Sequence, residues 1–270
     1  MNCKVIAEIG WNFMGDMSLA KEMIVSAKKS GADIAKFQYW NPRKLKPGPW
    51  DNDGRLEIYK AAALDEDKIR LLIDHCEDSG IGFLISAFNA SDANFIHSLG
   101  VKNLKIPSHE VANTKLHKFA STNFDEIYVS LGAGTTSEIS EACQIYNDVE
   151  GLSWVGMHCV SSYPCAPDQA NLPRLNHLRN FCERLGYSDH TADVITPALS
   201  IAYGACVVEK HFTVDKDLPG RDNKFALDPP QFSDMVKNIR SAEKTCYDHG
   251  PGPRDVENDT IMSYRGRWGD

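Results

Sequence analysis

Eight short runs rich in β-branched and aromatic residues alternate with amphipathic segments, and this alternation constrains the fold more than any other feature of the sequence. The runs lie at residues 5–10, 34–40, 82–88, 103–108, 126–132, 153–160, 186–189 and 206–212. Strands that alternate with helices form parallel sheets whose two faces must both be covered. Eight such units predict an α/β fold, a closed (β/α)8 TIM barrel, for which about 250 residues are typical. A doubly wound open sheet is the alternative.

Helical patterns separate the runs, and several have recognisable ends. The clearest lie at residues 18–31, 65–80, 136–148 and 229–245. Ser18, Asp65 and Thr136 are expected to cap three of these helices at the amino end, and Gly31 and Gly80 to close two of them.

Two segments depart from the pattern. Residues 41–55 are rich in proline, glycine and charge and predict a long loop after the second strand, on the side where barrel enzymes keep their active sites. Residues 251–270 show no regular pattern. We therefore expect a catalytic barrel over 1–250 and an irregular carboxyl-terminal tail over 251–270.

Composition excludes some classes of protein. The net charge of -8 argues against nucleic acid as a main partner, because binding to phosphate backbones requires a basic face. The 8 cysteines form no CxxC pair, as is typical of reduced thiols in a cytosolic protein. No apolar run reaches the roughly 18 residues of a membrane span. We expect a cytoplasmic protein.

Polar residues interrupt the predicted strands near their carboxyl ends, which meet at one mouth of a barrel. Two lysines and several hydroxyls would form a donor-rich cradle for phosphate or carboxylate. These residues are Lys36, Ser86, Lys105, Ser108, Ser130 and Ser188. His190 and His211, on adjacent strands, could bring two imidazoles to one divalent metal ion. Glu8, Glu110 and Asp222 are acceptors suited to sugar hydroxyls or to proton transfer.

Each of these residues also has a purely structural interpretation. A lysine in a strand commonly pairs with a neighbouring carboxylate, and a histidine at a strand end is commonly a hydrogen-bonded structural residue. Glu209 and Lys210 are expected to alternate in direction, so that one of them points away from the lumen. It is the convergence of about a dozen such residues that indicates a site.

Seven strings of the sequence together resemble the N-acetylneuraminate (sialic acid) synthase family. They are "AEIGWN" with Gly15, "AKFQ", "KIPSHE", "HCVSSYP", "GYSDHT", "EKHFT" and "PGRD", and they occur in this order from about residue 5 to 245. The resemblance implies a barrel transferase that forms a C–C bond between phosphoenolpyruvate and an N-acylated amino sugar, similar to N-acetylmannosamine. The implied products are a nine-carbon 2-keto sugar acid and phosphate.

The resemblance also implies roles for individual residues. Phosphoenolpyruvate would be bound by Lys36, Ser86, Lys105, Ser108, Ser130, Ser161 and Ser188. A divalent metal ion, Mn²⁺ or Mg²⁺, would be held by His190 and His211. The sugar would contact Glu8, Gln38, Tyr163 and Asp222. Glu110 would lie nearest the proton transfer, with Lys36 and Lys105 as the other catalytic residues. Asp189, Glu209 and Lys210 would support the structure.

The sequence departs from the family pattern at several positions. Asn12-Phe13 replaces the usual Asn-His and removes one polar group near the mouth. "PGRDN" replaces "PGPDH" and places Arg221 and Asn223 beside the expected sugar contact Asp222. The antifreeze-like domain that usually follows the barrel is expected to be absent. A homo-oligomer, or a separate polypeptide supplying that domain, is a possible partner.

Two other functions remain open from the residues alone. A Schiff-base pyruvate aldolase on the same barrel would use Lys36, Lys105 or Lys210 as its amine and would need no metal. A non-catalytic barrel would bind a sugar or an anion without turnover.

Overall fold

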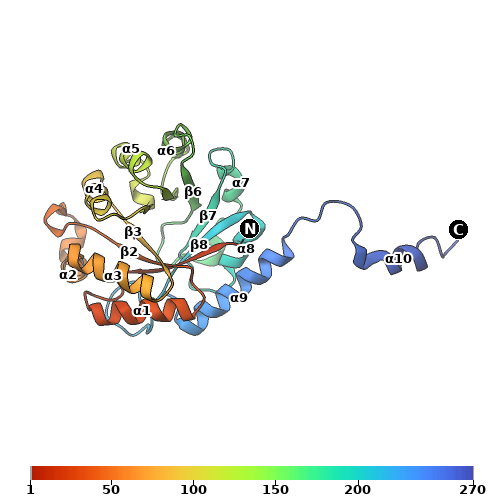
Figure 1. Ribbon diagram of the computed structural model, residues 1–270, viewed down its shortest axis with the longest axis horizontal. Helices are drawn as coiled ribbons and strands as arrows, with labels where there is room; N and C mark the ends of the chain where they lie inside the picture. Colours follow the sequence, from red (N-terminus) through yellow and green to blue (C-terminus); the bar gives the residue numbers. More distant parts are fainter. Residues whose placement is uncertain (1, 270) are drawn as a thin grey trace.

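The computed structural model describes residues 2–269 and confirms the closed barrel. Its eight parallel strands are β1 (Lys4–Gly10), β2 (Ile34–Gln38), β3 (Gly82–Ser86), β4 (Asn103–Ile106), β5 (Glu126–Ser130), β6 (Ser153–His158), β7 (Leu185–Asp189) and β8 (Ala205–His211). They follow one another around the ring in chain order, and β1 pairs with β8 to close it (Figure 1). Several strands, such as β2, β3 and β5, end two residues before the predicted runs.

Helices surround this barrel and supply the outer wall of its core (Figure 1). They are α1 (Met17–Lys29), α2 (Arg55–Ala61), α3 (Glu66–Asp78), α4 (Ala90–Ser98), α5 (Thr114–Asn123), α6 (Thr136–Asn147), α7 (Arg174–Leu178), α8 (Thr196–Ala202) and α9 (Pro229–Thr245). Within residues 2–269 no helix is both long and apolar enough to cross a membrane.

The helix ends confirm part of the expected capping. Asp65 caps α3, and Gly31 and Gly80 follow α1 and α3 with positive φ, as expected. Ser18 and Thr136 were the wrong caps. The Asp16 carboxylate accepts hydrogen bonds from the amides of Ser18 and Leu19, so α1 starts one residue earlier than predicted. Thr135 forms a reciprocal capping box with Glu138.

The segment at 41–55 is less irregular than expected. It contains two short 3-10 turns, Pro42–Lys44 and Pro49–Asn52, and leads directly into α2. The loop between β1 and α1 packs closely on the end of α2 at Gly15, which has φ +85°. A Cβ at Gly15 would lie 2.1 Å from the carbonyl oxygen of Ala61, so glycine is required there.

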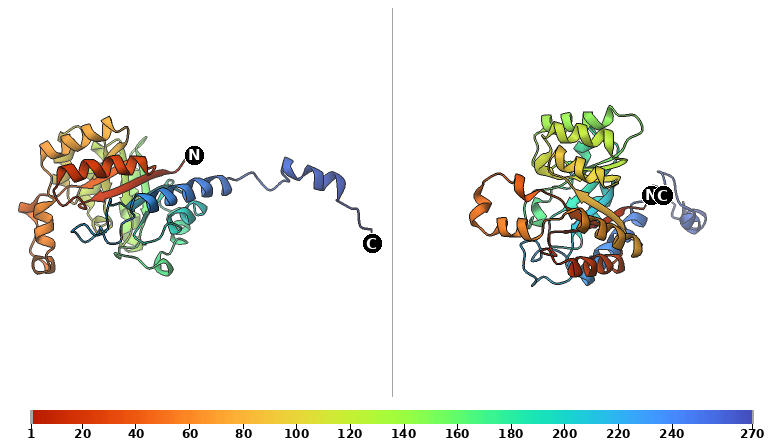
Figure 2. Two further views of the ribbon diagram at one scale, coloured as in Figure 1. Left: turned by 90° about the horizontal axis from the view of Figure 1, so that it is seen from below. Right: turned by 60° about the vertical axis from the view of Figure 1, so that its left-hand side comes forward.

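The tail also departs from expectation, because it contains a short helix, α10 (Asn258–Ser263). The tail leaves the end of α9 and runs away from the barrel, as both views in Figure 2 show. Its large apolar side chains are exposed, including Val256, Met262 and Trp268.

The amino end of the lumen is closed by apolar side chains and an ion-pair cluster. Ile6, Leu84, Tyr128, Val155, Met157 and Val207 fill this half of the barrel. Below them, Glu126 accepts hydrogen bonds from Lys4, Tyr128 and Arg184. Burial alone would raise the pKa of Glu126, but these hydrogen bonds, from Tyr128 and Lys4 first, outweigh burial and lower it. The opening of the lumen is therefore at the carboxyl ends of the strands.

All 8 cysteines are free thiols, as expected, and most are buried in the barrel and its helices.

Candidate active site

The carboxyl half of the lumen collects the polar side chains that interrupt the strands. Because side chains alternate along a strand, Glu8 points to the same side as Ile6, which fills the lumen below it. The same alternation places further buried polar side chains in the lumen. They are Lys36, Ser86, Lys105, Ser130, Ser188 and Glu209. The structure therefore brings both predicted lysines and four predicted hydroxyl or carboxylate residues together.

Ion pairs and hydrogen bonds link these side chains into one cluster. Lys36 Nζ lies 2.8 Å from Glu8 Oε2, 3.2 Å from Ser86 Oγ and 3.6 Å from Glu209 Oε1. Lys105 Nζ donates to Ser130 Oγ at 2.8 Å and lies 3.5 Å from Glu209 Oε1. Glu209 Oε1 also accepts a 3.0 Å hydrogen bond from Ser188 Oγ.

The electrostatics of the cluster follow from burial and from these pairs. Burial alone would lower the pKa of Lys36, but Glu209 and Glu8 outweigh it and raise that pKa. Burial lowers the pKa of Lys105, and Glu209 offsets this only in part. Burial alone would raise the pKa of Glu209, yet Lys105 and Lys36 bring it to about 2. Glu209 is thus held as a carboxylate between the two lysines.

The position of Glu209 corrects a prediction. Glu209 was expected to support the structure, but it faces the lumen and contacts both lysines. Lys210 is the residue that points away, as alternation requires, and it pairs with Asp189 and donates to the carbonyl oxygen of Thr191. Asp189 and Lys210 are structural residues, as expected.

Three predicted residues lie in the loops that follow β4 and β6. Ser108 Oγ and Ser161 Oγ are 2.7 Å apart, so the two loops meet at the mouth. Glu110 Oε2 accepts a 2.7 Å hydrogen bond from Asn113 Nδ2, at the start of α5. Within residues 2–269 no hydrogen bond or ion pair joins the Glu110 side chain to the lysine cluster, and its role in proton transfer stays a prediction.

His190 and His211 come together at the same mouth, with ring centroids 5.8 Å apart. His190 Nδ1 lies 2.6 Å from the carbonyl oxygen of Val160, so this nitrogen must carry the proton and Nε2 is left as a lone-pair donor. Among the described residues, His211 Nδ1 is buried and has no hydrogen-bond partner. Burial lowers the pKa of His190 to about 4 and that of His211 well below its ordinary value.

Two neutral, adjacent imidazoles with unused nitrogens fit a divalent metal ion. No group of three or more His, Cys, Asp or Glu side chains within residues 2–269 is arranged to hold one. The protein would therefore supply two ligands, and substrate or water would supply the others.

The predicted sugar contacts surround these imidazoles. Gln38 Nε2 donates to Glu8 Oε1 at the inner end. The Tyr163 ring packs against His190, with centroids 4.2 Å apart and the planes tilted by 42°, and Tyr163 is 45% exposed. Asp222 Oδ2 lies 3.7 Å from His211 Nδ1. All four predicted contacts line the mouth or the lumen below it.

Trp11 is a residue of the mouth that the sequence analysis missed. Its Nε1–H donates to Asp222 Oδ2 at 2.6 Å, and its ring packs against Trp40 and Tyr59. Burial raises the pKa of Asp222 to about 6, although the Trp11 hydrogen bond acts in the opposite direction. An indole directly after the first strand, in the quoted string "AEIGWN", was the available signal.

Two departures from the family pattern have structural explanations. Phe13 is buried and packs edge-on against Phe37 in the outer core. Asn223 is fully buried, accepts a 2.6 Å hydrogen bond from Thr213 and donates to the carbonyl oxygen of Asn12. Both residues hold loops in place and leave Asp222 as the polar group that faces the imidazoles.

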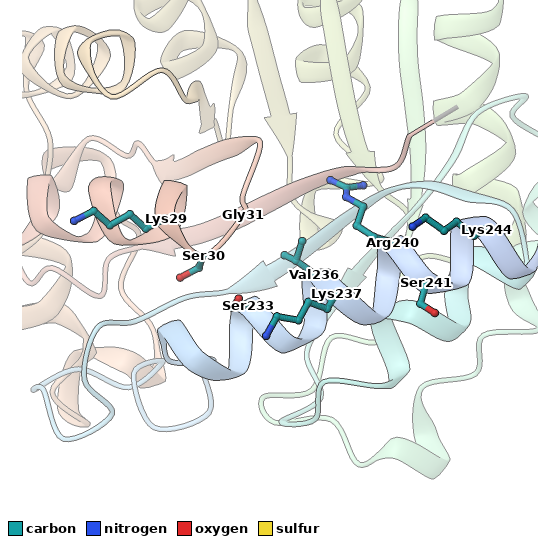
Figure 3. A pocket seen from close by; sticks show the side chains of 9 residues that line it. All are labelled: Lys29, Ser30, Gly31, Ser233, Val236, Lys237, Arg240, Ser241 and Lys244. Atoms are coloured by element: carbon teal, nitrogen blue, oxygen red, sulfur yellow. The ribbon is translucent and has the colours of Figure 1, made fainter.

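A separate groove of about 400 Å³ lies on the outer wall, between the end of α1 and α9 (Figure 3). Its lining includes Lys29, Lys237, Arg240 and Lys244. Arg240 pairs with Asp33 and Glu243, and Lys237 pairs with Asp234, so much of the positive charge is neutralised. The lumen remains the candidate active site.

Fold and site together define a (β/α)8 barrel of the kind that enzymes use, with two buried lysines in its lumen and two imidazoles at its carboxyl mouth. A family model described as the NeuB family matches residues 23–250. The chain belongs to the NeuB family, and it is an enzyme of that family.

Several known proteins that are similar to this chain are named as synthases. An N,N'-diacetyllegionaminic acid synthase of Legionella pneumophila is 36% identical and covers 95% of this chain and 77% of its own length. A mouse N-acetylneuraminate-9-phosphate synthase is 28% identical, over 90% of this chain and 70% of its own. The solved N-acetylneuraminic acid synthetase of Leptospira borgpetersenii superposes with a TM-score of 0.91 at 30% identity, over 99% of this chain and 94% of that one.

Proposed function

We propose that the protein condenses phosphoenolpyruvate with the open aldehyde form of an N-acylated amino sugar. The products would be a nine-carbon 2-keto sugar acid of the sialic acid type and inorganic phosphate. The observation that carries this proposal is the single lumen in which Lys36 and Lys105 lie beside His190 and His211. The names of the relatives, which are synthases of sialic, legionaminic and pseudaminic acids, support the same reaction class.

In this reaction C3 of phosphoenolpyruvate forms a bond to the aldehyde carbon of the sugar. Water adds at C2, and cleavage of the C2–O bond releases phosphate and leaves the ketone. Lys36 and Lys105 would neutralise the phosphate and carboxylate of phosphoenolpyruvate through both steps. The hydroxyls of Ser86, Ser130 and Ser188 would orient these groups.

The sugar would lie above this cradle. A divalent cation held by His190 and His211 would supply Lewis-acid polarisation of the aldehyde oxygen. Asp222, fixed by Trp11, would accept a hydrogen bond from a sugar hydroxyl. Glu110 is proposed to take the proton of the water that adds at C2.

The Schiff-base alternative rests on one lysine. Lys210 forms a buried ion pair with Asp189. Glu209 and Glu8 raise the pKa of Lys36, which disfavours the neutral amine that a Schiff base requires. Burial lowers the pKa of Lys105, as a nucleophilic amine requires. Borohydride trapping with pyruvate would label Lys105 if the protein were such an aldolase.

The synthase is tested with the purified chain, phosphoenolpyruvate, Mn²⁺ and a panel of aldoses that carry one or two N-acyl groups. We expect phosphate release with at least one sugar and a product mass equal to the sum of the substrates plus water minus phosphate. Chelation of the metal and Lys105→Met should each abolish release. Lys244→Met, in the outer groove, is the matched control and should retain it.

Absence of phosphate release with every aldose, with Mn²⁺ or Mg²⁺ present and the protein folded, would overturn the proposal. Activity that survives chelation and is stopped by borohydride would favour the aldolase.

A further inference from the structure

One carboxylate oxygen of Glu209 lies between three of the side chains that are predicted to bind the substrate anion. Glu209 Oε1 lies 3.6 Å from Lys36 Nζ and 3.5 Å from Lys105 Nζ, and accepts the hydroxyl of Ser188 at 3.0 Å. An oxygen of phosphate or carboxylate would need these same three partners. Glu209 and an anionic substrate therefore compete for one position.

The charges of the lumen lead to the same conclusion. Two ammonium groups, of Lys36 and Lys105, face two carboxylates, of Glu8 and Glu209. Counted as ions, the two ammonium groups and the two carboxylates carry no net charge before any ligand enters. An incoming polyanion gains a net attraction only if a carboxylate gives up its contacts with the lysines.

The two carboxylates differ in how they contact the lysines. Glu8 Oε2 lies 2.8 Å from Lys36 Nζ, and Glu8 Oε1 accepts a hydrogen bond from Gln38. Glu209 Oε1 lies farther from its two lysines, at 3.6 and 3.5 Å, and in the described part of the chain the Oε2 atoms of both carboxylates are buried with no hydrogen-bond partner. Within that part, Glu209 is also the only acidic partner of Lys105. Displacing Glu209 would leave Lys105 with its hydrogen bond to Ser130 but no carboxylate, while Lys36 would keep its ion pair with Glu8.

We infer that Glu209 is a resident counter-anion of the phosphate cradle. It occupies the position of a substrate anion in the free protein, moves off the lysines when phosphoenolpyruvate binds, and returns to them as inorganic phosphate leaves. This role deepens the proposed function and rests on it. It makes Glu209 a determinant of how tightly phosphate, the product, is retained.

The experiment measures the affinity of the full chain for inorganic phosphate by calorimetry at pH 7.5 and constant ionic strength. Glu209→Gln keeps the shape of the side chain and removes its charge. We expect its Kd for phosphate to fall at least about tenfold relative to wild type, because a like charge within a few ångströms of the ligand is removed. Glu126→Gln changes the net charge equally at the opposite end of the barrel and should leave the Kd within about twofold.

Glu209→Asp provides a second variant with the charge retained. Its shorter side chain reaches the lysines less well, so its Kd should lie between those of wild type and Glu209→Gln. An unchanged or weaker phosphate affinity in Glu209→Gln would overturn the inference. So would failure of both Glu209 variants to fold while Glu126→Gln folds, because the carboxylate would then be needed for the barrel itself.

Turnover separates this inference from the proposed reaction. Tighter phosphate binding in Glu209→Gln, without turnover of any sugar by wild type, would support the counter-anion and overturn the synthase. Turnover by wild type with the same phosphate affinity in both proteins would support the synthase and overturn the counter-anion.

Discussion

Lys210→Met tests the buried ion pair that joins β7 to β8. The Asp189 carboxylate accepts hydrogen bonds from the hydroxyl of Tyr187 at 2.8 Å, from the amide of Thr191 at 2.9 Å and from the hydroxyl of Thr191 at 2.8 Å. Lys210 supplies its countercharge, and the two side chains are 1% and 0% exposed. Methionine preserves the volume of the lysine stem but leaves the carboxylate without a cation.

The expected loss of folding stability follows from leaving the Asp189 carboxylate buried without a cation. Removing one partner of a buried ion pair costs about 3–5 kcal/mol. The three remaining hydrogen bonds stabilise the Asp189 carboxylate, so we expect the lower end, about 3 kcal/mol. For a chain of this size such a loss corresponds to a decrease in Tm of about 6–12 °C.

Thermal and urea unfolding followed by circular dichroism provide the measurement. Asp189→Asn combined with Lys210→Met should be more stable than the sum of the single losses predicts, because neither charge is then left alone. Lys237→Met removes an exposed ion pair with Asp234 and should change stability by less than about 0.5 kcal/mol. A Lys210→Met protein within about 1 kcal/mol of wild type would refute the reasoning.

Three further outcomes are expected. Gly54→Ala adds a side chain at positive φ where no described atom lies within 4 Å, and it should lower the free energy of unfolding by about 1 kcal/mol. Gly15→Ala adds the clash with α2 and should lower it by about 3 kcal/mol, measured by urea unfolding. Equal losses in the two variants would contradict the clash. His211→Ala should abolish Mn²⁺ binding measured by electron paramagnetic resonance while the exposed His177→Ala retains it, and unchanged binding in the former would exclude the imidazole pair as the metal site. The folded-state pKa of Glu126 is lowered, so its carboxylate stabilises the fold above the ordinary pKa of 4.5 and this contribution is lost as the pH falls. The difference in unfolding free energy between wild type and Glu126→Gln should therefore narrow below pH 4.5. A difference that does not depend on pH would contradict this.

The barrel was predictable because every level of the sequence agrees on it. The strand runs, the helical periods and the glycines after α1 and α3 all indicate the same eight units. The errors lie at helix starts, where Asp16 and Thr135 bind the free amides in place of the neighbouring Ser18 and Thr136. Two adjacent polar residues compete for a cap, and only the backbone geometry decides between them.

The candidate site was predictable where the strand ends determine it. Lys36, Lys105 and both histidines follow from the position of polar residues near the carboxyl ends of strands. Glu209 was assigned to the wrong side of its strand, although the sequence contained the information needed. Side chains two residues apart on a strand point to the same side, so if His211 faces the mouth, Glu209 must face the lumen as well. Trp11 and Asp222 could not be paired beforehand, because loops 211 residues apart in the chain bring them together.

Closure of the ring between β1 and β8 also determines when the lumen can exist. Lys4 of the first strand lies beside Val207 of the last, and Arg240 of α9 donates a 2.6 Å hydrogen bond to the carbonyl oxygen of Cys3. During synthesis one edge of the first strand therefore stays unpaired until nearly the whole barrel has left the ribosome. The cradle draws Lys36 from β2 and Glu209 from β8, so it forms only when the ring closes. A nascent chain would acquire the ability to bind its substrate in one late step.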